Sequence, residues 1–342
     1  MSDRQALLDE IGGVRGRDLL TLRPPPPIFT GLPLREDTLG VVTAPSFTGK
    51  TMFALDMAIC MDFNLPLFGL YPPRRPSHRA LYLGLDSPKW DLGGQLLKLM
   101  RGHGLPPEQR ALFDTDLIIR QGIHFTDPKF HEWLARYYDA YPFTVLIGDT
   151  YRKLKPPHMA ENSNDEATAF MAVAGDMRDK HPGMCFMLLH HVVKPTEVNR
   201  GDNDRAAGAG ALIGSADWHI SLRPKANGLY ISYPKGRGGG SMPIKSLVME
   251  DIETQELNPD GTQAWGIKLA APGATRNEIV LDALRALHKP CTRKDIVASK
   301  ELQQSYDKLD DAQQYKLVDN ALSDLSAQKK IRSVARGLWE VK

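Results

Sequence analysis

The sequence LGVVTAPSFTGKT, residues 39–51, joins a β-branched run to a loop of small and polar residues and then to an apolar helix. In this order of elements, successive backbone N–H groups and the helix N-terminus point into one concave space. That space is positive, because the N–H dipoles add to the partial charge of the helix end. The stretch therefore predicts an anion-binding loop within an α/β sheet.

Eight of these residues match the Walker A phosphate-binding pattern, except that alanine stands where the first glycine is usual. They are Ala44, Pro45, Ser46, Phe47, Thr48, Gly49, Lys50 and Thr51. Lys50 adds a point charge for the β- and γ-phosphates, and the Thr51 hydroxyl is a ligand for Mg²⁺. We predict a site for ATP with Mg²⁺ as cofactor. A chance match is the weaker alternative, because the strand and helix supply the required context.

Two aspartates follow apolar strands of the same expected sheet. Asp149 ends FTVLIGD, residues 143–149, as a Walker B acid that orders the Mg²⁺ shell together with Thr51. A carboxylate that only caps a loop is the alternative. Asp86 ends LYLGLD, residues 81–86, where a carboxylate can orient the attacking water. Equally, Asp86 can be the N-cap of the following helix.

Two adjacent histidines end a further apolar run, MLLHH, residues 187–191. Neighbouring side chains on a strand point in opposite directions, so at most one imidazole faces the γ-phosphate as a sensor. We assign this catalytic position to His190, and its neighbour then packs or meets solvent. A two-histidine metal site is less favoured, because no third ligand stands at a usable spacing.

Short apolar strands alternate with helices between residues 38 and 189. The expected strands are residues 38–44, 80–85, 117–120, 143–148 and 184–189, and the expected helices are residues 50–62, 89–102, 128–141 and 165–180. This alternation predicts a parallel sheet covered on both faces. The later segments 218–222, 229–233, 244–250 and 266–269 leave no room for helices. They predict an antiparallel extension of the sheet.

The composition is that of a globular protein. Of the 342 residues, 42% are hydrophobic, and the net charge of +2 does not by itself indicate a nucleic-acid partner. Cys60, Cys185 and Cys291 are far apart, so we interpret them as buried small hydrophobes in a reducing compartment. The N-terminus lacks an uninterrupted apolar core, and no segment has the length of a membrane span. We expect a cytoplasmic protein without a membrane partner.

Three parts follow from these patterns. Residues 1–27 form an N-terminal arm with a short helix that the Pro24–Pro27 run ends. This arm is either a strap that reaches a neighbouring subunit or a solvated tail. Residues 28–270 form the nucleotide-binding domain, and residues 271–342 form a smaller, more basic domain.

The small domain is predicted to contain three helices and a hairpin. Thr275 to Glu278 and Thr292 to Asp295 have capping patterns, residues 315–329 give a third helix, and residues 330–341 fit a short hairpin. Three helices and a hairpin resemble a winged helix, a small α+β fold. Its candidate contacts with duplex DNA are Lys329, Arg332 and Arg336. Winged helices also dock proteins, and several aspartates here dilute the positive charge.

Taken together, these motifs resemble the RecA-fold hexameric replicative helicases, both the DnaB group and the plasmid-encoded RepA type. The likeness spans residues 24–269. It depends on residues 28–33 before the phosphate loop, on DTYR at 149–152, on ENSND at 161–165, on LHH at 189–191 and on KGRG at 235–238. The resemblance implies a RecA-like ATPase core that assembles as a homo-oligomer, a ring of six subunits, around single-stranded DNA.

The resemblance also implies roles for residues outside the phosphate loop. In that family a Lys-x-Arg turn reaches the neighbouring subunit's γ-phosphate, so Lys235 and Arg237 become catalytic charges acting in trans, with Arg237 as the arginine finger. An exposed glycine-rich hairpin is the alternative for residues 235–240. Lys194, Arg200 and Arg205 would line the channel and neutralise DNA phosphates. A solvated loop is the competing interpretation of that segment, because nearby acids offset its charge.

One departure from the family bears on activity. The family usually has glutamate where this chain has Asp86, and aspartate is one methylene shorter. Hydrolysis is therefore expected to be slow, or another acid serves. The resemblance implies a DNA-dependent ATPase and DNA helicase of the RepA-like group. The alternative is an ATP-switched DNA-binding or regulatory ATPase that assembles on nucleotide without unwinding.

Overall fold

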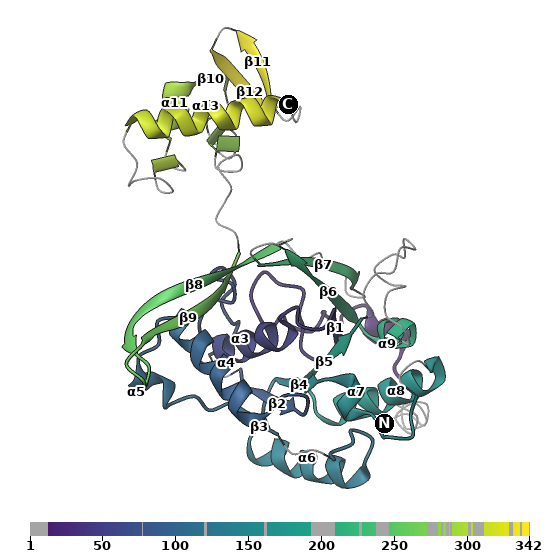
Figure 1. Cartoon of the computed structure of the whole chain (residues 1–342). Helices are drawn as coiled ribbons and strands as arrows, with labels where there is room; N and C mark the ends of the chain where they lie inside the picture. Colours follow the sequence, from purple (N-terminus) through teal and green to yellow (C-terminus); the bar gives the residue numbers. More distant parts are fainter. Residues whose placement is uncertain are drawn as a thin grey trace. The chain divides into compact units, whose positions relative to one another are not determined.

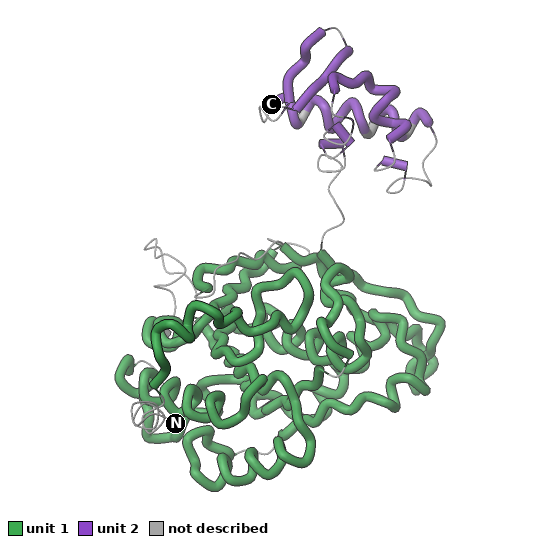
Figure 2. The backbone as a smooth tube through the Cα atoms, turned by 180° about the vertical axis from the view of Figure 1, so that it is seen from behind, with its two compact units in different colours: residues 1–271 green, residues 272–342 purple. Residues whose placement is uncertain are grey.

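The computed structural model contains two compact units, residues 1–271 and residues 272–342 (Figure 2). The structure describes residues 13–76, 78–119, 122–160, 163–192, 209–225, 228–236, 246–271, 280–281, 283–284, 287, 289–299, 302–303, 311–327, 331–335 and 337–341. The division lies next to the boundary at residue 270 that composition predicts.

A single nine-stranded sheet organises the first unit (Figure 1). Its order is β3-β2-β4-β5-β1-β6-β7-β8-β9. The strands are β1 (Leu39–Ala44), β2 (Ala80–Gly84), β3 (Asp116–Ile118), β4 (Val145–Asp149), β5 (Cys185–His191), β6 (Trp218–Lys225), β7 (Gly228–Gly236), β8 (Ser246–Leu257) and β9 (Gln263–Ala270). Strands β1 to β6 pair in parallel, and β1, β2 and β4 are buried along their whole length. The predicted α/β class and parallel core are confirmed.

The antiparallel part of the sheet begins one strand later than we predicted. The strand that starts at Trp218, β6, pairs in parallel with β1, with Gly40 opposite Trp218. The pairs β6–β7, β7–β8 and β8–β9 are antiparallel. Strands β8 and β9 are also longer than the predicted segments. The outer half of β8 has only exposed and half-buried residues, and the outer end of β9 has single residues of differing burial, so neither gives a continuous apolar run.

Helices cover both faces of the sheet. The described helices of this unit are α2 (Gly16–Leu19), α3 (Lys50–Asp62), α4 (Lys89–Gly102), α5 (Pro107–Arg110), α6 (Pro128–Ala140), α7 (Tyr151–Leu154), α8 (Asn164–Lys180) and α9 (Ala209–Ser215). Strand alternation divides the core: Val42 faces the layer of α3 and α4, and Val41 faces the layer of α6, α7 and α8. Helix α3 is buried almost all round, so its sequence has no polar face.

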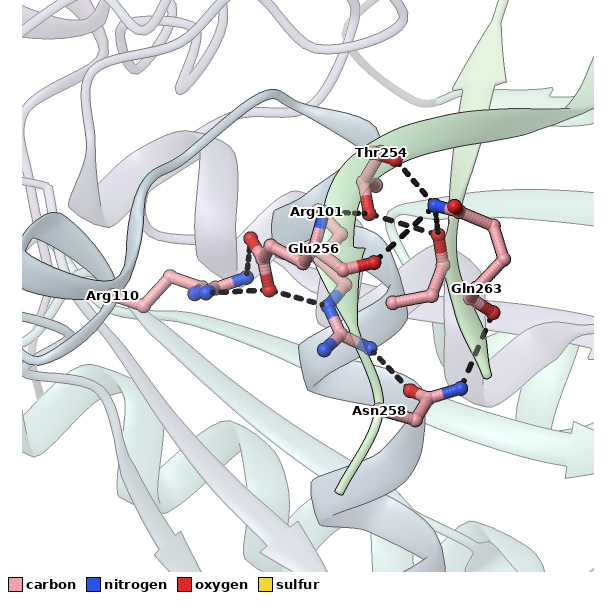
Figure 3. Close-up of polar contacts among 7 residues, drawn as sticks. Arg101, Arg110, Thr254, Glu256, Asn258 and Gln263 are labelled. Carbon is pink, nitrogen blue, oxygen red and sulfur yellow. Dashed lines mark hydrogen bonds and ion pairs between the residues drawn. The ribbon is translucent and has the colours of Figure 1, made fainter. Parts of the chain in front are cut away.

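The β8–β9 ribbon curves alongside α4 (Figure 1). Figure 3 shows how its far end is fixed. Glu256 of β8 accepts hydrogen bonds at 3.0 Å from Arg101 of α4 and from Arg110 of α5. Asn258 joins the same group through Arg101. Two guanidinium groups on one carboxylate make a network, which holds the ribbon more firmly than one surface ion pair would.

The described residues of the second unit include a three-stranded sheet of order β10-β12-β11 and the helices α11 and α13. Its elements are β10 (Cys291–Thr292), α11 (Arg293–Val297), α13 (Asp311–Ala327), β11 (Ile331–Ala335) and β12 (Leu338–Val341). Thr292 and Asp295 form the capping box that the sequence predicts, and β11 with β12 forms the predicted hairpin. The proposed capping pair of Thr275 and Glu278 lies outside the described residues.

Only a short part of the predicted N-terminal helix lies in the described residues. It is α2, a four-residue helix with no buried side chain. In the described part of the chain, no helix combines the length and the apolar character needed to cross a bilayer. All three cysteines are free and buried, as expected.

Candidate nucleotide site

The phosphate loop connects β1 directly to α3. Gly49, the last residue before the helix, has φ +92°, a left-handed conformation that favours glycine. Phe47 also has a positive φ of +61°, and its ring is fully exposed. Ala44, at the departure from the Walker pattern, is buried at the end of β1. The loop therefore adopts the predicted geometry with alanine at its first position.

Lys50 lies folded against the loop that it follows. Its Nζ donates hydrogen bonds to the carbonyl oxygens of Ala44 and Pro45, both at 3.0 Å, and lies 3.1 Å from Nδ1 of His191. Burial lowers the pKa of the Lys50 ammonium to about 8, against the attraction of Asp149 and Asp86. A phosphate that displaces these carbonyls would face a poorly hydrated ammonium group. The attraction between the phosphate and Lys50 is then stronger than in water, because little water screens the two charges.

Asp149 and Thr51 meet as the sequence predicts. Thr51 Oγ1 donates to Asp149 Oδ2 at 2.8 Å, and the hydroxyl of Tyr82 donates to the same oxygen at 2.6 Å. Burial raises the pKa of Asp149, and these two hydrogen bonds oppose that rise. Both hydrogen bonds therefore favour the ionised form of Asp149 over the protonated form, and they fix the orientation of its carboxylate.

Tyr82 was not predicted as a site residue. It is fully buried in β2, beside Ile147 of β4, on the face of the sheet that α3 covers. Asp149 lies two residues beyond Ile147 and so points to that same face. The available signal was a hydroxyl in the otherwise aliphatic strand ALYLG, residues 80–84. A buried tyrosine hydroxyl usually has a hydrogen-bond partner.

Asp86 lies beside the loop but is already engaged. One carboxylate oxygen is 3.4 Å from Nε2 of His191, and the other is 3.8 Å from Nζ of Lys153. The hydrogen bond with His191 is the main cause that lowers the pKa of Asp86. The N-cap of α4 is Pro88, so the alternative role of Asp86 as that cap is wrong.

The structure corrects the choice between the two histidines. His190 is 1% exposed, its ring packs edge-on against Tyr151 at 5.5 Å, and burial lowers its pKa to about 3. His191 lies opposite Ala44 in the β1–β5 register and so stands at the loop, with Nδ1 3.3 Å from Ser46 Oγ. The predicted alternation is present, but its phase places His191, and not His190, beside the phosphate loop.

These side chains line one open cavity of about 440 Å³. Its lining comprises Ser46, Phe47, Thr48, Gly49, Lys50, Thr51, Met52, Asp86, Ser87, Asp91, Gln95, Asp149 and His191. The volume lies within the range of small-ligand pockets, about 300–1,000 Å³. The carboxyl ends of β1, β2, β4 and β5 meet here, which is where open α/β sheets bind ligands.

Of the proposed trans-acting and DNA-contacting residues, Lys235 and Arg332 lie in the described part of the chain, and Lys235 is not among the residues that line this cavity. Lys235 is the penultimate residue of β7, and its Nζ donates to the carbonyl oxygens of Ile213 at 2.7 Å and Gly214 at 2.6 Å. Arg332 of β11 pairs with Glu340 across the hairpin. The remaining candidates lie outside the described residues; they are Arg237, Lys194, Arg200, Arg205, Lys329 and Arg336.

The sheet order, the phosphate loop and the strand-end carboxylates define a P-loop protein with a RecA-like core. Residues 5–197, more than half of the chain, match the family model described as an AAA domain. The chain belongs to the AAA domain family. No curated protein matches the sequence.

A solved structure titled "ATPase Domain of G40P" is similar to this chain. The match has a TM-score of 0.50 and 15% sequence identity, and it covers 72% of this chain and 95% of that one. At this identity, the similarity shows a shared fold and indicates nothing about shared partners.

Proposed function

We propose that this protein is a Mg²⁺-dependent ATPase. One observation supports the proposal above the others: Thr51 and Asp149, on different elements, share a 2.8 Å hydrogen bond directly beside Lys50. Their hydroxyl and carboxylate oxygens are the hard donors that Mg²⁺ prefers, so these two residues would hold the ion. When bound, Mg²⁺ neutralises charge on the β- and γ-phosphate oxygens.

The remaining residues of the cavity then have distinct roles. Lys50 exchanges the carbonyl oxygens of Ala44 and Pro45 for phosphate oxygens. Asp86 orients the attacking water, and His191, between Lys50 and Asp86, reports whether a γ-phosphate is present. Tyr82 acts through Asp149 and is a positioning residue.

We propose further that the ATPase is a ring-forming DNA helicase of the RepA-like type. The supporting observations are the motifs at 149–152, 189–191 and 235–238 and a fold similar to that of the G40P ATPase domain. Arg237, with Lys235, would complete the site of a neighbouring subunit, and Lys194, Arg200 and Arg205 would contact single-stranded DNA. A cation that arrives only with the neighbour couples hydrolysis to assembly.

The second unit would be a winged helix that contacts duplex DNA or another replication protein. A three-stranded sheet with the β11–β12 hairpin and the helices α11 and α13 supports this assignment. The Arg332–Glu340 pair weakens one predicted DNA contact, because the carboxylate neutralises that guanidinium.

The test is the ATPase rate with and without single-stranded DNA, together with the native mass of the assembly. We expect DNA to stimulate turnover in an oligomer, and Lys50→Ala to abolish turnover without loss of the fold. A monomer whose turnover ignores DNA would overturn the helicase proposal.

The contacts of Asp86 favour a second candidate function. Its carboxylate is held by His191 and Lys153, which slows hydrolysis if they stay in place after ATP binds. An ATP-switched DNA-binding or regulatory protein would then hydrolyse ATP slowly and assemble when it binds nucleotide, without unwinding DNA. A forked-duplex assay separates the two functions, because ATP hydrolysis without strand displacement supports the switch.

A further inference from the structure

A cluster of three metal-ligating side chains lies between α3 and α4, away from the nucleotide cavity. Asp56 and Cys60 are one turn apart on α3, and His103 is the C-cap residue of α4. One ligand atom from each residue lies within 4.8 Å of the others. Asp56 is five residues along α3 from Thr51, the proposed Mg²⁺ ligand, which is about 7.5 Å at the rise of an α-helix. This cluster is therefore separate from the predicted Mg²⁺ position.

The cluster is buried, and one of its oxygens has no partner. Asp56 and Cys60 are both 0% exposed. Asp56 Oδ1 is 2.6 Å from Nε2 of His103, but Asp56 Oδ2 is buried with no hydrogen-bond partner within the described part of the chain. A buried carboxylate oxygen without a partner is costly, and natural proteins rarely leave one.

Burial also disfavours both anions of the cluster. It raises the pKa of Asp56, against the opposing effects of His103 and Lys268, and it raises the pKa of the Cys60 thiol well above its ordinary value. A divalent cation reverses this balance, because it pairs with a carboxylate and a thiolate at once. Lys268 is the competing positive charge.

We propose that Asp56, Cys60 and His103 form a binding site for a transition-metal ion, with Zn²⁺ as the best fit. Thiolate, imidazole and carboxylate are the ligands of zinc, and Mg²⁺ and Ca²⁺ do not select sulfur or nitrogen. Tetrahedral ligands at zinc distances lie about 3.3–3.6 Å apart. His103 Nε2 is 3.8 Å from Cys60 Sγ and 2.6 Å from Asp56 Oδ1, so these two pairs need shifts of less than about 1 Å to reach zinc geometry.

The site would fix the helix of the phosphate loop to its neighbours. Gly102, next to His103, lies against Gly266 of β9 so closely that a Cβ on either residue would clash. An ion held by α3 and by the end of α4 therefore stabilises the junction of α3, α4 and β9. The sequence did not indicate this site, because its ligands come from two helices and have no Cys-x-x-Cys spacing.

The test is a titration of the full chain with Co²⁺ after treatment with a chelator, since Co²⁺ replaces Zn²⁺ and is coloured. We expect one equivalent of Co²⁺ to bind with a thiolate-to-cobalt charge-transfer band, and Zn²⁺ to displace it. Cys60→Ser should reduce the band more than tenfold, and His103→Gln should weaken Co²⁺ affinity at least tenfold. Cys185→Ser, the matched change at another buried cysteine, should keep the band.

Folding failure of Cys60→Ser would not leave the proposal undecided. The double variant Cys185→Ser, Cys291→Ser has Cys60 as its sole thiol and should retain the whole band. The proposal is overturned if the wild-type chain shows no charge-transfer band with Co²⁺, if a folded Cys60→Ser keeps that band, or if the double variant loses it. None of these measurements depends on ATP hydrolysis, so they also stand if the proposed ATPase function is wrong.

Discussion

Nδ1 of His191 lies 3.1 Å from Nζ of Lys50. The other nitrogen of the same ring is 3.4 Å from Asp86, so one imidazole bridges the lysine of the phosphate loop and the acid proposed to orient water. A γ-phosphate that attracts Lys50 would remove one charged partner of His191 and leave Asp86 as the other. The arrangement provides a direct route from nucleotide occupancy to the position of Asp86.

We expect His191→Ala to lower kcat roughly 10- to 100-fold, the value of a lost hydrogen bond to a charged group. The KM for ATP should change little, because Lys50 and the loop backbone stay in place. Steady-state kinetics with single-stranded DNA measure both quantities. The control is His190→Leu, which should keep turnover because neither ring nitrogen of His190 has a partner among the described residues. Equal losses in the two variants would contradict the assignment.

We expect Tyr82→Phe to weaken the hold on Asp149. The change removes the 2.6 Å hydrogen bond to a buried carboxylate, worth about 1.5–3 kcal/mol. Turnover should fall roughly 10- to 100-fold, and more Mg²⁺ should be needed for half-maximal rate. Tyr138→Phe is the matched control, because its hydroxyl donates to the Pro182 carbonyl and neither residue lines the cavity. An unchanged Mg²⁺ requirement in Tyr82→Phe would remove its positioning role.

Arg237→Ala should keep ATP binding and lose turnover by about 10³-fold or more, as for an arginine finger. Mixing tests whether the residue acts on a neighbour. Lys50→Ala and Arg237→Ala subunits are each inactive, but a random mixture restores both residues at roughly a quarter of the interfaces. ATPase assays of equimolar mixtures give the result. Recovery of activity supports a shared site, and full turnover by Arg237→Ala alone would exclude the finger.

Glu256→Gln should loosen the β8–β9 ribbon. The network with Arg101 and Arg110 is partly exposed, so we expect a loss of about 1 kcal/mol and a Tm lower by about 2–4 °C. Glu253→Gln, an exposed change on the same strand, should leave Tm unchanged. Thermal unfolding at low and high salt checks both, and a salt-independent loss would argue against the ion-pair explanation.

The same network predicts a pH dependence. A hydrogen bond from Arg110, together with one from Arg101, lowers the pKa of Glu256 below its ordinary value of 4.5. The folded state therefore binds fewer protons than the unfolded state. The stabilisation is fully present above pH 4.5 and is lost as the pH falls through the lower folded pKa. The Tm difference between the wild type and Glu256→Gln should shrink on acidification.

Local sequence patterns were sufficient to predict the strands and helices at the core of the first unit. The predicted helices at residues 50–62 and 89–102 begin and end where α3 and α4 do. Both predictions succeed because an apolar run and the residues that end a helix are local properties of the sequence. The outer halves of β8 and β9 were missed, because half-exposed strands carry little apolar signal. The parallel pairing of β6 was also missed, since strand direction depends on where the chain crosses the sheet.

The sequence by itself determined the phosphate loop, the two strand-end aspartates and the α/β class, because each depends on neighbours along the chain. Only the tertiary structure decided that His191 faces Lys50, that Tyr82 orients Asp149, and that Asp56 and Cys60 meet His103. The first depends on the phase of strand alternation, and the others join residues 67 and 47 positions apart. No local periodicity encodes such contacts, because the packing of whole layers brings those side chains together.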